Sequence, residues 1–228
     1  VYTDRSKTEN GRVSYPIYHI DNAQAQSKGG HPKTIIFLTC DAYGVLPPIA
    51  KLTRGQAMYQ FISGYTAKVA GTERGVTEPS PTFSACFGAA FLPLHPTVYA
   101  DLLAEKLETH GTQVYMINTG WTGGAYGVGE RISLAHTRAC VRAALNGEFD
   151  DNEASFAKEP EFGFQVPTEV NDVPSNVLDA RGSWEDPTAY DDQARKLAAL
   201  FRANYKQFRD PTKTDYEMYG PILETFRP

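Results

Sequence analysis

The stretch "QVYMINTGWTGGAYGVGERISLAHTR", residues 113–138, carries the strongest local pattern of the chain. Its apolar start predicts a strand over 113–120, and a glycine-rich loop follows. Ser133 is placed to cap a helix over 134–146, which Gly147 ends. Strands and helices mixed in this way predict an α/β or α+β fold, and nothing marks a clean domain boundary.

The same stretch suits an anionic or nucleotide ligand. A helix N-terminus presents unpaired N–H groups and the positive end of the helix dipole, and Arg131 stands beside it. Leu134, Thr137 and Val141 follow at i, i+3 and i+7, which predicts an inward face with a hydroxyl on it. The alternative is structural: glycine-rich turns before helices are common, and Thr137 could bond back to the carbonyl of Ser133. Neither GxGxxG nor a Walker A motif occurs, so no phosphate loop is predicted within the chain.

Two apolar segments precede this stretch. "VSYPIYHI" (13–20) alternates in part, and Pro16 favours an edge strand or a bulge. "TIIFLTCDA" (34–42) has the composition of a strand buried on both faces of a sheet. Asp41 at its end has two open roles, since it could line a cleft beside the sheet or cap the turn "GVLPP".

Helices are predicted from their ends. Thr53 and Gln56 form a capping box that begins a helix ending at or before Gly71. A second helix belongs to 95–111, with Pro96 in its first turn and Gly111 after its end. The inward positions of the first helix pattern are Met58, Phe61, Ile62 and Tyr65.

The C-terminal third is less regular. Residues 148–190 are rich in Pro, Asp and Glu and contain only short strand-like pieces such as "FGFQVP". A last helix is predicted over about 188–208, and the final twenty residues look like a loosely attached tail. The inward face of that helix is Ala194, Leu197, Ala198, Phe201, Tyr205 and Phe208.

Composition excludes several classes of protein. The 228 residues are 41% hydrophobic and 21% charged, with a formal net charge of −5, which argues against a nucleic-acid binder. No apolar run approaches the length of a membrane span. Cys40, Cys86 and Cys140 form no CxxC pair, so they are expected to be buried, reduced thiols. The five histidines lack metal-ligand spacing, and no metal site is predicted in this chain.

"AGTERGVTEPSPTFSACFGAAF" (70–91) places a polar, glycine-flanked segment between two apolar ones. By pattern alone it is a long surface loop. Its first polar residues are Gly71, Thr72, Glu73, Arg74 and Gly75.

Taken together, four strings resemble the C-terminal part of ATP-dependent phosphoenolpyruvate carboxykinase. They are "TENGRVSYPIYHIDN", "FLTCDAYGVLPP", "SGYTAKVAGTERGVTEPSPTFSACFGAAFLPLHP" and "NTGWTGGAYGVGERISLAHTR". The resemblance runs in order over roughly residues 1–210. It implies a mixed α/β, two-lobed enzyme, of which residues 1–228 would be a partial C-terminal nucleotide-binding domain.

The resemblance also implies a reaction and its residues. Oxaloacetate and ATP would give phosphoenolpyruvate, CO2 and ADP, with Mg²⁺ and Mn²⁺ as metal ions. Arg12 would contact the γ-phosphate and the substrate, and would stabilise charge during transfer. Arg131, Ile132 and Thr137 would line the adenine and ribose side of the ATP site. The polar segment within about 70–83, with Gly71, Thr72, Glu73, Arg74 and Gly75, would be a lid that excludes water.

The family's phosphate loop, metal ligands and oxaloacetate-binding residues would lie upstream of this chain. The missing N-terminal part of the same enzyme is therefore the expected partner, and the fragment alone should be inactive. A cytoplasmic location is the default expectation, with an organellar form left open. Two alternatives stay open: a non-catalytic nucleotide-binding module, and a related kinase without decarboxylation.

Overall fold

The computed structural model describes residues 13–69, 75–150 and 155–222. Its centre is a five-stranded mixed sheet in the order β1-β5-β2-β9-β8. β1 and β5 are parallel, whereas the other neighbouring strands of this sheet pair antiparallel. Its strands are β1 (Thr34–Thr39), β2 (Ile49–Leu52), β5 (Gln113–Asn118), β8 (Phe156–Lys158) and β9 (Gln165–Pro167). The prediction of a mixed α/β fold is confirmed.

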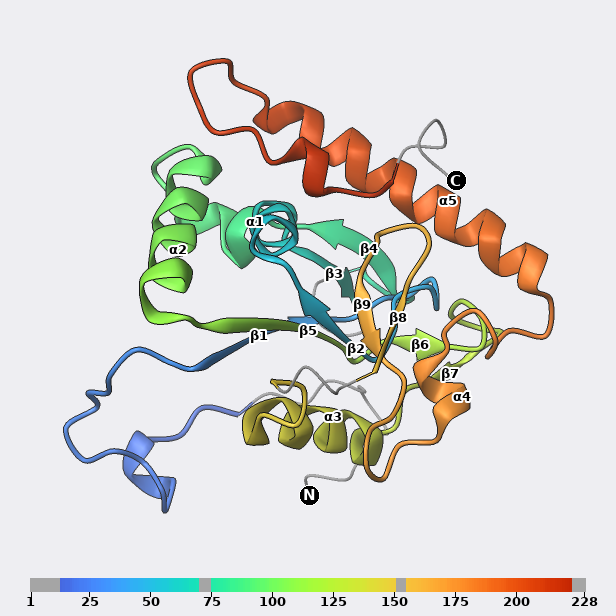
Figure 1. The fold of residues 1–228 in the computed structure, drawn as a ribbon, viewed down its shortest axis with the longest axis horizontal. Coiled ribbons are helices and arrows are strands. Elements are labelled where there is room, and N and C mark those ends of the chain that lie inside the picture. Colours follow the sequence, from blue (N-terminus) through green and yellow to red (C-terminus); the bar gives the residue numbers. More distant parts are fainter. Residues whose placement is uncertain (1–12, 70–74, 151–154, 223–228) are drawn as a thin grey trace.

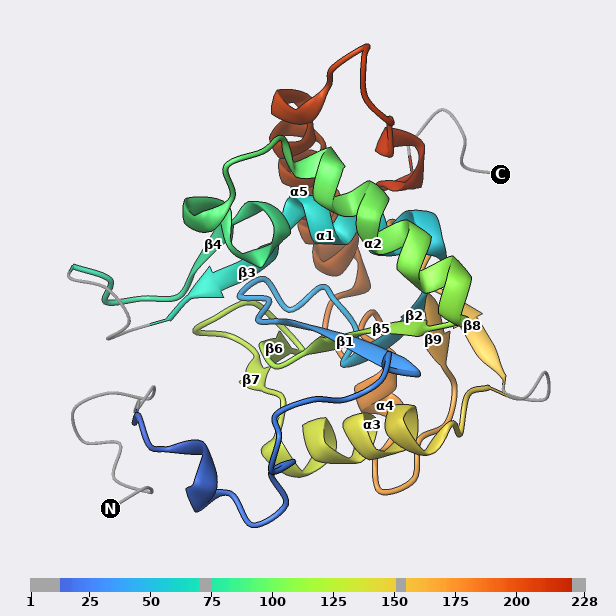
Figure 2. The ribbon, with the colours of Figure 1, turned by 90° about the vertical axis from the view of Figure 1, so that its left-hand side faces the viewer.

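Helices cover both faces of this sheet, as Figure 1 shows. One face carries α1 (Arg54–Ser63), α2 (Pro96–His110) and α5 (Pro187–Tyr205). The other carries α3 (Leu134–Asn146) and the short α4 (Ser175–Leu178). Figure 2 shows α3 lying below the strands and the α1–α2 pair above them.

β5 is buried on both faces of the sheet. Val114 and Met116 point into the core beneath α1 and α5, while Tyr115 and Ile117 pack with α3 and α4. This alternation follows from the two-residue period of a strand. The sequence predicted two-sided burial for 34–42 instead, and that prediction was wrong: β1 lies at the sheet edge, and Leu38 is 59% exposed.

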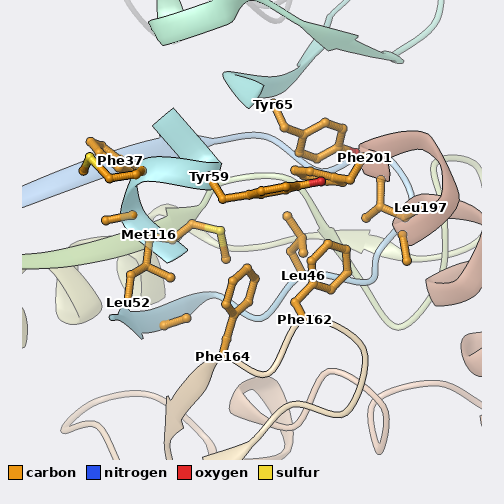
Figure 3. Close-up of a cluster of buried hydrophobic side chains, with 14 of the residues drawn as sticks. Phe37, Leu46, Leu52, Tyr59, Tyr65, Met116, Phe162, Phe164, Leu197 and Phe201 are labelled. Atoms are coloured by element: carbon orange, nitrogen blue, oxygen red, sulfur yellow. The ribbon is translucent and has the colours of Figure 1, made fainter. Parts of the chain in front are cut away.

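Aromatic side chains fill the larger core, shown in Figure 3. The ring of Phe201 on α5 lies 5.2 Å from that of Phe162 and 4.9 Å from that of Tyr65. Tyr59 on α1 stacks on Tyr205 with ring centroids 4.9 Å apart. Buried aromatic rings of this size remove the most apolar area per residue, so α5 is an integral part of the core.

The helix ends match the sequence signals. Thr53 and Gln56 make both hydrogen bonds of the capping box. Gly111 and Gly147 end α2 and α3 with φ of 61° and 74°, in the left-handed region that favours glycine. The first helix ends early, at Ser63, and the chain turns there into a hairpin.

Two further strand pairs and short 3-10 turns complete the fold. The hairpin consists of β3 (Tyr65–Lys68) and β4 (Ser80–Phe83), and the second pair of β6 (Trp121–Thr122) and β7 (Glu130–Arg131). The 3-10 turns are η1 (Ile17–His19), η2 (Ala85–Phe87), η3 (Ala89–Phe91), η4 (Lys206–Phe208) and η5 (Glu217–Tyr219). Among the described residues, no helix is long and apolar enough to cross a membrane.

Two terminal predictions were wrong. Residues 13–20 contain no strand; Ile17–His19 form the turn η1, because His19 N–H bonds to the Pro16 carbonyl and closes the chain locally. The described part of the C-terminal segment is not a loose tail. Tyr216 is buried, and its hydroxyl donates to Asp101 of α2 at 2.6 Å.

Candidate functional site

The carboxyl ends of β1 and β5 lie side by side at one end of the sheet, because the two strands are parallel neighbours. Asn118, the last residue of β5, is fully buried there. Its Oδ1 accepts from the N–H of Asp41 at 3.0 Å and of Gly120 at 2.8 Å, and its Nδ2 donates to the carbonyl of Leu46 at 2.7 Å. One amide side chain thus joins both strand ends and the turn after β1.

Asp41 caps the turn that follows β1. Its carboxylate accepts from the N–H groups of Tyr43, Val45 and Leu46 and from the hydroxyl of Tyr65, at 2.7 to 2.9 Å. Burial raises the pKa of this fully buried carboxyl, and the hydrogen bonds act in the opposite direction. Of the two roles left open by the sequence, the structure shows the turn cap.

Gly120 brings the two strand ends into backbone contact. A Cβ at this position would lie 2.2 Å from the carbonyl oxygen of Asp41 and 2.3 Å from its nitrogen. The chain then runs beside the turn that follows β1, since Trp121 N–H donates to the Asp41 carbonyl and Tyr126 N–H to the Ala42 carbonyl, both at 2.9 Å. Only glycine fits this crossing.

The glycine-rich loop after β5 is fixed from two sides. A Cβ on Gly44, whose φ is 71°, would lie 2.1 Å from the carbonyl oxygen of Gly124. On the other side, the hydroxyl of Ser183 accepts from Gly123 N–H at 3.0 Å and lies 3.2 Å from the Thr122 hydroxyl. The loop is therefore packed against two segments distant in sequence.

Arg131 lies at the end of this loop, on β7. It pairs with Trp121 across the β6–β7 ladder, and its guanidinium lies 5.4 Å from the centre of the indole ring. Its Nε donates to the carbonyl of Thr119 at 3.1 Å. Tyr126 meets the same indole edge to face, with ring centroids 5.4 Å apart. The exposed guanidinium is thus oriented by a ring, a carbonyl and a strand pair.

Ile132 and Thr137 follow Arg131 into α3. Ile132 is buried, and its N–H donates to the carbonyl of Gly120 at 2.8 Å. Thr137 is half-buried, and its N–H donates to the carbonyl of Ser133 at 3.0 Å in the first helical turn. The predicted inward face was wrong at Leu134, which is 62% exposed. The buried positions of α3 are Ala139, Cys140, Ala143 and Ala144.

Several predicted site residues lie outside the described residues. These are Arg12 and four residues of the predicted lid, Gly71, Thr72, Glu73 and Arg74. Gly75 is described; it is exposed and has a φ of 86°. The β3–β4 hairpin that flanks this segment is joined to β1, because the Thr39 hydroxyl donates to the Tyr65 carbonyl at 2.7 Å.

Four structural partners of the site were not predicted from the sequence: Asn118, Trp121, Tyr126 and Ser183. Asn118 carried a usable signal, as a polar residue at the end of an apolar strand just before a Thr-Gly pair. Ser183 carried none, because its contact joins segments sixty residues apart.

The described residues do not fit a divalent metal site. They include no group of three or more His, Cys, Asp or Glu side chains placed to hold a metal ion. The carboxylate of Asp41 is occupied by four donors of the protein. None of the three cysteines, all of which are described, forms a disulfide; Cys40 and Cys140 are buried, whereas Cys86 is half-buried, with its pKa raised to about 11 by burial.

A separate pocket of about 380 Å³ lies between the β8–β9 pair and α4. It contains none of the predicted site residues. Glu159 in its wall is buried, and its carboxylate accepts from the N–H of Glu161 at 3.0 Å and of Phe162 at 2.6 Å. Burial raises the pKa of Glu159 to about 7. These hydrogen bonds show that Glu159 stabilises a turn. The carboxyl ends of β1 and β5 beside Arg131 and Ile132, both predicted site residues, are therefore the better candidate site.

Comparison with known proteins gives consistent matches. A family model described as phosphoenolpyruvate carboxykinase matches residues 1–176. A Lysinibacillus sphaericus protein named phosphoenolpyruvate carboxykinase (ATP) is 55% identical over 221 residues, 97% of this chain and 42% of that relative. A Moorella thermoacetica protein named phosphoenolpyruvate carboxykinase (ATP) 1 is 58% identical, over 92% of this chain and 39% of that relative. A Thermus thermophilus relative with the (ATP) name is 54% identical, with 98% and 42% coverage. The chain thus spans about two fifths of the length of these relatives.

Proposed function

Because the chain belongs to the ATP-dependent phosphoenolpyruvate carboxykinase family, we propose that it is the C-terminal part of such an enzyme. The complete enzyme converts oxaloacetate and ATP to phosphoenolpyruvate, CO2 and ADP. The family resemblance of the four sequence strings is confirmed by relatives at 53–58% identity. The activity is proposed for the whole protein, of which this chain is a part.

In this proposal the carboxyl ends of β1 and β5, beside Arg131, hold the adenine and ribose end of ATP. The observation that carries it is the orientation of the Arg131 guanidinium by Trp121 and by the Thr119 carbonyl, next to the start of α3. Ile132 supplies a buried apolar wall, and Thr137 a hydroxyl on the first turns of the same helix. A planar cation beside an apolar surface suits a flat heterocycle.

The phosphate end of the site rests on the resemblance. Arg12 would stabilise the charge that develops on the transferring phosphoryl group, and the segment from Gly71 to Gly75 would close over it. Mg²⁺ or Mn²⁺ would neutralise phosphate charge, with ligands supplied by the part of the enzyme that precedes this chain. No described residue is assigned to either metal.

The test is an activity assay of the full-length protein. It should consume oxaloacetate and form phosphoenolpyruvate in the presence of ATP, Mg²⁺ and Mn²⁺, and it should not do so without ATP. Arg12→Ala should lower kcat by at least about 100-fold, the typical loss when an electrostatic contact to a transition state is removed. If full-length protein consumes no oxaloacetate, or transfers phosphate without releasing CO2, the proposal is wrong.

A further inference from the structure

Trp121, Tyr126 and Arg131 form one continuous cluster near the carboxyl ends of β1 and β5, called the stack below. The Tyr126 ring meets the Trp121 indole edge to face at 5.4 Å, and the Arg131 guanidinium lies over the same indole at 5.4 Å. Trp121, which lies between the other two side chains, is 5% exposed, whereas Tyr126 is 43% exposed. A buried ring therefore supports the charged group that reaches the surface.

The main chain holds both aromatic residues in place. Trp121 N–H donates to the Asp41 carbonyl, and Tyr126 N–H donates to the Ala42 carbonyl. The backbone of both residues is therefore bound to the turn after β1. Trp121 and Arg131 are also direct partners across the β6–β7 ladder, where opposite side chains lie on the same face. The stack is a property of the backbone pairing as much as of the side chains.

We propose that Trp121 and Tyr126 are positioning residues of the nucleotide site, acting through Arg131. The indole of Trp121 fixes the plane of the guanidinium, and Tyr126 fixes the indole. This inference rests on the proposed function, in which Arg131 contacts the base of ATP. Neither aromatic side chain is proposed to touch the reacting atoms.

The consequence is a selective effect on ATP binding. A cation–π contact of this kind corresponds to a change of roughly 3- to 30-fold in an equilibrium constant. Loss of the indole should therefore raise KM for ATP by about tenfold. kcat should stay within about twofold and KM for oxaloacetate should not change, because the stack does not touch the transferring group.

The experiment uses four variants of the full-length enzyme: Trp121→Leu, Trp121→Phe, Tyr126→Ala and Trp184→Leu. Trp121→Leu should raise KM for ATP about tenfold. Trp121→Phe should raise KM for ATP much less, since a phenyl ring keeps a π-face. Tyr126→Ala should raise it about threefold; this exposed position also tests the stack if Trp121→Leu does not fold. Trp184→Leu is the control, because it removes an indole that packs on the same turn through the Gly44 carbonyl but not on Arg131.

A double-mutant cycle with Arg131→Ala tests the route of the effect. If Trp121 acts through Arg131, Trp121→Leu should add less than about twofold to KM for ATP in the Arg131→Ala background. A full tenfold effect in that background would overturn the positioning role. An unchanged KM for ATP in both Trp121→Leu and Tyr126→Ala would overturn it as well.

Failure of the inference can be told apart from failure of the proposed function. If Arg131→Ala raises KM for ATP while the aromatic variants do not, only the stack is refuted. If wild-type enzyme shows no ATP-dependent consumption of oxaloacetate, the proposed function fails first.

Discussion

Replacing Asn118 with alanine tests how the two strand ends are held together. The substitution removes three hydrogen bonds and leaves the N–H groups of Asp41 and Gly120 and the carbonyl of Leu46 without this partner. A buried polar group that loses its partner costs about 1–3 kcal/mol, and water entering the vacated space recovers part of the sum. We therefore expect local destabilisation of about 3 kcal/mol.

Hydrogen–deuterium exchange of the full-length protein measures this effect locally. A loss of about 3 kcal/mol corresponds to roughly 100-fold faster exchange of amides that open with the strand ends. The acceleration should appear in peptides covering 41–46 and 118–126. Asn146→Ala is the matched control, because Asn146 is exposed at the end of α3. Exchange within about threefold of wild type in both peptides would refute the role assigned to Asn118.

Three further substitutions have definite expected outcomes. Gly120→Ala places a Cβ against the Asp41 backbone, so it should destabilise the protein by about 3 kcal/mol, measured as a lowered Tm; an unchanged Tm would contradict the crossing. Because Glu159 has its pKa raised to about 7, the folded state binds the proton more tightly, and stability should fall as pH rises from about 4.5 to about 7. Glu159→Gln should remove about 3 kcal/mol of that pH dependence in urea unfolding, and an identical pH profile would argue against it. Thr53→Ala should cost about 1 kcal/mol through loss of the capping box with Gln56, and a gain in stability would count against the cap.

Local features were predictable from the sequence because they depend on few residues. The starts of α1 and α3 and the ends of α2 and α3 followed from Thr53, Ser133, Gly111 and Gly147. Each of these residues satisfies or terminates helix hydrogen bonds within its own turn. The α/β class was also predictable, because it depends only on which segments are strands and helices and on their order along the chain.

Strand burial and side-chain orientation were not predictable in the same way. Apolar composition cannot distinguish β1, at the sheet edge, from β5, at its interior, because burial depends on which strands pair beside them. Residues 13–20 alternate in part, yet they contain no strand and Ile17–His19 form a 3-10 turn. Leu134 fits a helical inward pattern, yet the sheet covers the side of α3 that carries Ala139 and Cys140.

The candidate site was predictable only in part. Arg131 and Ile132 stand out beside a glycine-rich loop, but their roles came from the resemblance and stay proposals. The supporting contacts could not be foreseen, because Asn118 bonds to Asp41 seventy-seven residues away and Ser183 to Gly123 sixty residues away. Such contacts exist only once the chain has folded.

The most direct test of the central claim is equilibrium binding of ATP to the full-length protein and to its Arg131→Ala variant. If this chain supplies the base end of the nucleotide site, the variant should bind ATP at least about tenfold more weakly, a loss of about 1.4 kcal/mol. Its Kd for oxaloacetate should remain that of the wild type. Equal Kd values for ATP in the two proteins would contradict the account.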